Sequence, residues 1–202
     1  MRRPVCGMIS SNASILIAGD NEQKLSLIEE GLRADGYENL SISIGLAGLA
    51  AMLEGVQPQA IILQLEHSTN LIQQGVFQFC HAAFKPTIVF VDQTDEASTD
   101  MAIETGIAAY IVDGLKKERI KPILQMAVSR FENRSGMMRE LETARTELQD
   151  RKVIDRAKGF LMQSKGMSEE QAYGLMRKAA MDQNLKVRDI ANNLILAADL
   201  LK

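Results

Sequence analysis

Ser-Ile-Leu-Ile-Ala-Gly-Asp at residues 14–20 is a short apolar run that ends in turn residues. Apolar residues then recur at helical spacing, at Leu25, Ile28 and Leu32, which predicts a buried strand feeding an amphipathic helix. The same alternation continues toward residue 121. It predicts further strands over 40–44, 60–65, 87–91 and 109–112, and helices over 46–53, 71–84, 96–105 and after residue 112. Five strands alternating with five helices indicate a doubly wound, parallel α/β sheet covered on both faces.

Functional residues of such sheets lie at the carboxyl ends of the strands, and here those positions read Gly19-Asp20, Gln64, Val91 and Asp113. The segment over 14–121 resembles a response-regulator receiver domain. Receivers hold two acidic residues for magnesium, a phosphoryl-accepting Asp, a Thr or Ser, and a Lys at these places. Only Asp20 matches that set.

The departures bear directly on phosphorelay chemistry. The neutral amide of Gln64 is no phosphoryl acceptor, Gly19 removes half of the magnesium ligation, and Asp113 replaces the cation that would pair with phosphate. We therefore expect a pseudo-receiver domain that receives its signal by docking a protein or by setting dimer geometry. On local sequence alone, Asp20 is expected to cap the next helix.

The connector over 122–150 continues the helical pattern. At alternating spacings of four and three, five of the seven positions from 127 to 148 are apolar, and Arg134 and Arg145 break the seam. This pattern predicts a short coiled coil and therefore a homodimer. The alternative is a single helix that folds its apolar stripe against its own domain. Ser135-Gly136 is a point where the helix could bend or end. The apolar positions are Ala127, Phe131, Met138, Leu141 and Leu148.

Charge divides the chain unevenly. Residues 1–150 carry 13 Lys and Arg against 20 Asp and Glu, whereas 151–202 carry 10 against 6. A local cationic patch favours contact with a polyanion, although a solvated helical surface gives the same count. Within 151–202, apolar spacing predicts the end of the long helix to Lys165, a second helix that starts after Ser168, and a third after Asn184.

This last domain resembles the ANTAR domain of transcription antiterminators of the AmiR and NasT type. The resemblance is carried by Arg-Ala-Lys-Gly-Phe-Leu-Met at 156–162, Gly-Met-Ser-Glu-Glu-Gln-Ala-Tyr at 166–173 and residues 175–184. Residues 110–115 and 127–131 resemble the NasT branch in particular. That branch implies binding to paired leader hairpins of nitrate and nitrite assimilation transcripts, control by a NasS-like nitrate or nitrite sensor, and only indirect contact with RNA polymerase.

Cationic, amide and aromatic side chains read unstacked loop bases, while stems offer phosphates. The strongest candidates for RNA contact are Lys158, Arg177 and Lys178, and Tyr173 is a candidate stacking platform unless it belongs to the core. The further candidates are Lys165 and the pair Gln183 and Asn184, which alternatively only end the second helix.

Two other function classes stay open at this stage. One is a DNA-binding response-regulator-like transcription factor with a helix-turn-helix, although the joint over 182–186 lacks a tight glycine turn; the other is a protein-interaction adaptor that binds no nucleic acid. No catalytic residue, cofactor or metal site is expected, because neither His67 nor His81 has a nucleophile or paired carboxylates nearby. Two cysteines and no apolar run of about 20 residues favour a cytoplasmic protein without a membrane segment. Residues 1–13 are expected to form a flexible tail.

Overall fold

The computed structural model describes residues 9–46, 49–67, 75–76, 80 and 82–200. It divides into two compact units, Met1–Ser135 and Gly136–Lys202. No helix among the described residues has the length and apolar character needed to cross a membrane.

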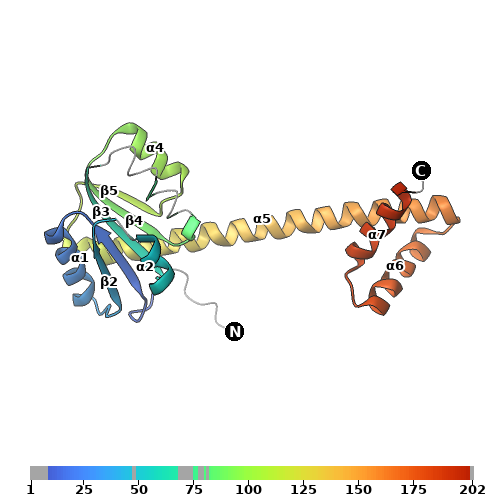
Figure 1. Ribbon diagram of the computed structural model, residues 1–202, viewed down its shortest axis with the longest axis horizontal. Coiled ribbons are helices and arrows are strands. Elements are labelled where there is room, and N and C mark those ends of the chain that lie inside the picture. The colour runs from blue at the N-terminus through green and yellow to red at the C-terminus, as the bar shows by residue number, and fades with distance from the viewer. Residues whose placement is uncertain (1–8, 47–48, 68–74, 77–79, 81, 201–202) are drawn as a thin grey trace. The chain divides into compact units, whose positions relative to one another are not determined.

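The first unit is built on a five-stranded parallel sheet in the order β2-β1-β3-β4-β5. The expected doubly wound α/β fold is therefore confirmed (Figure 1). The strands β3 and β4 each run two residues further than expected at the carboxyl end. The strand bounds are β1 Ile15–Gly19, β2 Leu40–Ile44, β3 Ala60–His67, β4 Thr87–Gln93 and β5 Ala109–Val112.

Alternate residues of the strands enter two different cores, as a sheet buried on both faces requires. Ile15 and Ile17 face the core formed with α1 and the first part of α5 (Lys117–Lys165), whereas Leu16 and Ala18 face the core formed with α2 and α4. Figure 1 shows the sheet with these helices around it. The bounds are α1 Glu22–Ala34, α2 Leu49–Val56 and α4 Glu96–Glu104. Most of the helix expected over 71–84 lies outside the described residues.

The described residues before β1 pack against the rest of the first unit. Ala13 is buried, and the backbone oxygen of Asn12 accepts a hydrogen bond from Asn39 Nδ2 at 2.9 Å. Ile9 packs against the core that contains α1. Of the tail expected over 1–13, residues 1–8 lie outside the described part of the chain.

One helix, α5, runs from Lys117 to Lys165, with Pro122 near its start and no break at Ser135-Gly136. Its apolar stripe changes surroundings along its length. Ala127 is fully buried in the first unit, and the ring of Phe131 lies edge-on to Phe84 with 5.2 Å between centroids. The early stripe therefore folds against its own domain. The later positions Met138, Leu141 and Leu148 are 54%, 53% and 61% exposed.

The second unit contains the end of α5 with α6 (Glu169–Gln183) and α7 (Val187–Leu200). Ser168 and Gln171 form the expected capping box, in which each side chain accepts from the other residue's backbone N–H. The three helices share one apolar core. Its buried members are Ala157, Leu161, Ala172, Met176, Ala180, Ile190 and Ala191.

Candidate nucleic-acid interface

The residues that correspond to a receiver's phosphorylation pocket lie at the carboxyl end of the sheet. Parallel pairing sets Gly19 beside Gln64, and Gln64 is 1% exposed. The Gln64 Oε1 atom accepts a hydrogen bond from the backbone N–H of Asn21 at 3.2 Å. Val91 is buried, and its backbone oxygen accepts from the N–H of Asp113, whose φ is +46°. An amide thus fills the place of the phosphoryl acceptor.

The expectation that Asp20 caps α1 is wrong. Asn21 is the N-cap, and its side chain accepts from the N–H of Lys24 at 3.1 Å. Both carboxylate oxygens of Asp20 instead lie 3.1 Å from the backbone nitrogen of Glu66, whose N–H they accept. Either Asp or Asn can cap a helix, so the local sequence could not choose between neighbours.

Four further polar residues surround this pocket and were missed by the sequence analysis. Lys24 forms an ion pair with Asp92, and Asn21 donates its side-chain N–H to Glu66 at 2.5 Å. Lys24 and Asp92 are 68 residues apart, so only the sheet register could bring them together. A cation therefore stands beside the pocket, but it comes from α1 and pairs with Asp92, while the position after β5 holds Asp113.

Restoring the acidic residue at position 19 should destabilise the first unit. A Cβ atom at Gly19 would lie 2.4 Å from the backbone oxygen of Gln64, a contact that no side-chain change at position 64 relieves. We expect Gly19→Asp to lower the free energy of unfolding by about 1–3 kcal/mol, measured by urea denaturation. Gly55→Asp is the matched control, because a Cβ there meets nothing within 4 Å. Equal stability of the two variants would contradict the expectation.

The candidate RNA contacts lie in the second unit. Tyr173, Arg177 and Lys178 are exposed on α6, and residues four apart share a helix face, so Tyr173 and Arg177 are neighbours. Tyr173 is 44% exposed and is therefore not a core residue. Lys165 is exposed at the end of α5.

Gln183 and Asn184 end α6. Asn184 is the C-cap in the left-handed conformation, with φ +53° and ψ +39°. Asn is the residue that most often replaces Gly in this conformation. The missing glycine at the joint between α6 and α7 therefore gives no argument against a helix-turn-helix, because Asn184 makes the turn that a glycine would make.

Lys158 has a different environment from the other candidate cations. Its Nζ atom lies 2.6 Å from Asp155 Oδ1 and 2.7 Å from Glu169 Oε1, and only 16% of its side chain is exposed. The hydrogen bonds that Lys158 donates, first to Asp155 and then to Glu169, raise the pKa of Lys158 above its ordinary value. The bond to Glu169 ties α5 to the first turn of α6, whereas the bond to Asp155 lies within α5. Lys158 is consequently less available to a phosphate than the exposed Arg177 and Lys178.

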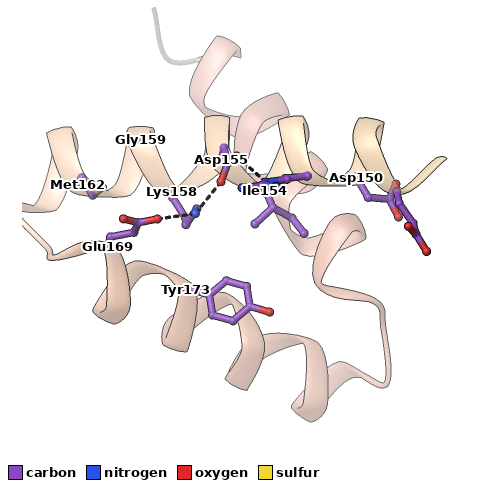
Figure 2. Close-up of a pocket in the computed structure, with 10 residues that line it drawn as sticks. Asp150, Ile154, Asp155, Lys158, Gly159, Met162, Glu169 and Tyr173 are labelled. Atoms are coloured by element: carbon purple, nitrogen blue, oxygen red, sulfur yellow. Dashed lines mark hydrogen bonds and ion pairs between the residues drawn. The ribbon is translucent and has the colours of Figure 1, made fainter. Parts of the chain in front are cut away.

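A groove of about 700 Å³ opens between the end of α5 and α6. Figure 2 shows Lys158 between Asp155 and Glu169, with the ring of Tyr173 between the two helices. Arg188 of α7 donates to Asp150 on the rim at 3.1 Å. The lining residues are Glu147, Asp150, Arg151, Ile154, Asp155, Lys158, Gly159, Met162, Glu169 and Tyr173.

A model of the ANTAR domain family matches residues 142–195, which include all of the candidate RNA contacts. The chain is 26% identical over 181 residues to the transcriptional regulatory protein PdtaR of Mycobacterium tuberculosis, covering 88% of this chain and 86% of that one. It is 36% identical over 78 residues to the nitrate regulatory protein of Klebsiella oxytoca, covering 39% and 19% respectively. Both relatives are regulatory proteins by name.

Solved structures resemble the first unit in fold. The signal receiver domain of a modulated diguanylate cyclase from Desulfovibrio desulfuricans G20 aligns with a TM-score of 0.53 and 13% identity, over 61% of this chain and 98% of that one. This likeness concerns the fold alone. It agrees with the receiver-like order of the five parallel strands.

Proposed function

We propose that this chain, which is an ANTAR-domain regulator of the AmiR/NasT family, binds paired hairpins in a leader transcript and thereby prevents transcription termination. The observation that carries the proposal is the exposed pair Arg177 and Lys178 on α6, inside the matched domain. Such cations neutralise stem phosphates and release counterions. Tyr173, one turn earlier on the same helix, offers a ring to an unstacked base.

The remaining proposed contacts extend this surface at both ends of the helix pair. Lys165 adds an exposed cation at the end of α5, and Gln183 and Asn184 add amide groups where α6 ends. Amides can both donate to and accept from base edges, which suits sequence reading better than phosphate contact.

The signal is proposed to arrive through a protein partner in the cytoplasm. Gln64 occupies the acceptor position, and the acid at position 20 is already engaged by the backbone of Glu66. A nitrate- or nitrite-sensing protein of the NasS kind is the proposed partner, and nitrate or nitrite assimilation genes are the proposed targets. The likeness to a protein named nitrate regulatory protein supports that choice.

Dimerisation is proposed to pair two RNA-binding domains for two hairpins. Met138, Leu141 and Leu148 lie exposed along the part of α5 beyond the first unit. Apolar residues at this spacing are buried when a second helix packs against them. RNA polymerase is expected to respond only through the RNA structure.

Replacing Arg177 or Lys178 by Ala should weaken RNA binding and lower its salt dependence. Each lost phosphate contact should reduce the slope of log affinity against log salt by about one. Binding would be measured by gel-shift titration against a paired-hairpin leader RNA from nitrate or nitrite assimilation genes, a loop-scrambled version and duplex DNA. Arg119→Ala is the matched control, because Arg119 is an exposed cation of the first unit.

Each outcome of this titration selects one function. Preference for the intact loops supports RNA antitermination, whereas tighter binding to duplex DNA supports a DNA-binding regulator. Absence of binding to all three nucleic acids, with the nitrate- or nitrite-sensing partner both present and absent, would favour an adaptor. Unchanged affinity and slope in both variants would place the RNA interface away from α6.

A further inference from the structure

The groove between α5 and α6 combines an aromatic ring, apolar side chains and polar groups. Tyr173 stands at its side, Ile154 and Met162 supply apolar surface, and Gly159 adds no side chain beyond its Cα. Its volume of about 700 Å³ falls within the roughly 300–1,000 Å³ of sites that take small organic groups. An exposed tyrosine beside such a groove is suited to stack a flat ring.

The charges of the groove argue against a phosphate as its occupant. Four carboxylates line it against two cations. Lys158 is already held by Asp155 and Glu169, and Arg151 lies 4.0 Å from Asp155. A phosphate would have to displace these carboxylates from their cations. Of the two cations, Lys158 is held on both sides, whereas the exposed Arg151 is only loosely paired, and the excess of carboxylates still disfavours an anion.

The same ion pairs also weaken the case for a bare cation. Asp150 is paired with Arg188, while Asp155 and Glu169 are both paired with Lys158. With Arg188 counted, four carboxylates face three cations, so one net negative charge remains. The carboxylate oxygens also keep lone pairs that can accept further hydrogen bonds. The occupant that fits is an uncharged, flat ring whose edge carries N–H donors. A nucleobase with an exocyclic amino group has these properties.

We propose that the groove takes one unstacked base of a hairpin loop, stacked on Tyr173, with its amino-bearing edge toward the carboxylates of Glu169 and Asp155. This inference rests on the proposed function, RNA binding, and the groove would be the place where the protein reads a base. Arg177 lies one turn along α6 from Tyr173, so it is placed for the phosphate beside the inserted base. Lys158 then acts as a positioning residue that holds Glu169 of α6 beside Asp155 of its own helix.

The test combines single abasic substitutions at each loop position of the leader RNA with the protein variant Tyr173→Ala. In the wild-type protein, one loop position should lose about five- to 150-fold in affinity when its base is removed, the range expected for a stacked base. In Tyr173→Ala the same substitution should cost almost nothing, because the ring that the base contacts is gone. Tyr173→Phe keeps the ring and should behave like the wild type.

Leu175→Ala is the matched control. Leu175 is 40% exposed on α6, close to the 44% of Tyr173, but it does not line the groove. For Leu175→Ala, the affinity lost at each abasic RNA position should equal the loss measured with the wild type. Thermal melting should show that both alanine variants are folded. At the sensitive loop position, a base with an amino group should also bind more tightly than uracil.

The outcomes separate this proposal from the one on which it rests. Suppose the wild type binds the hairpins, but the loss of binding free energy in Tyr173→Ala simply adds to the loss at every abasic RNA position. The proposed base site is then wrong, and RNA binding by the protein stands. If Tyr173→Ala binds RNA as tightly as the wild type, the groove is free for a protein partner instead. If the wild type binds no hairpin, the proposed function fails and the base site with it.

Discussion

Replacing Leu141 and Leu148 together by Glu should make the protein monomeric and lower its affinity for paired hairpins by about 10²- to 10⁴-fold. Both side chains are more than half exposed on α5, and with Met138 they form the apolar part of the seam beyond the first unit. Charges placed opposite each other in a two-helix seam repel and cannot be buried without a large cost. The large loss of affinity comes from avidity, because a dimer binds its second hairpin as an intramolecular step.

Oligomeric state would be measured by sedimentation, and affinity by titration of RNAs that carry one or two hairpins. The double variant should bind both RNAs equally weakly, whereas the wild type should prefer two hairpins. Thr143→Glu with Thr146→Glu is the matched control, since these exposed positions lie on the same helix but outside the seam. A double leucine variant that stays dimeric would show that the subunits meet elsewhere.

The seam itself illustrates what periodicity can and cannot reveal. Spacing predicted an apolar stripe from Ala127 to Leu148, broken only at Arg134 and Arg145. In the structure Ala127 is buried by the first unit, whereas Leu148 is 61% exposed. A helical repeat records that a face is apolar, but it carries no information about which partner covers each part. The alternative of a stripe folded against its own domain therefore holds for the first part of α5, whereas the coiled coil stays a prediction for the exposed part beyond it.

The sheet was predictable because its signal is local. Runs such as Ile15–Gly19 are apolar at every position, as strands buried on both faces must be, and the predicted β2 and β5 have the observed bounds. The capping box at Ser168 is equally local, since its two members are three residues apart. These features need only neighbouring residues to be recognised.

The polar details of the candidate site were not predictable in the same way. Lys158 looked like a free cation, yet Glu169 reaches it from 11 residues further along, across the turn between α5 and α6. Asp150 and Arg188 meet from 38 residues apart. Such pairs depend on how the helices cross, and the groove that they line exists only once α5 and α6 have packed.

Leu161→Ala should unfold the second unit while leaving the first unit folded. Leu161 is 1% exposed in the core that α5, α6 and α7 share. Truncating a buried leucine typically costs about 2–5 kcal/mol, because apolar contacts are lost and a cavity is left. A unit over 136–202 has a total stability of only about 3–10 kcal/mol at the usual value per residue. The substitution therefore removes a large share of that stability, and RNA binding should be lost with the fold.

Hydrogen exchange followed residue by residue would measure this effect, because it reports each unit separately. Amides of α6 and α7 should lose protection in Leu161→Ala, whereas amides of β1 and β3 should keep it, since their core contains no residue of the second unit. Met162→Ala is the matched control, as the neighbouring side chain is 40% exposed. Equal loss of protection in the sheet would mean that the two units unfold as one. Their stability would then depend on the continuity of α5 and not on two separate cores.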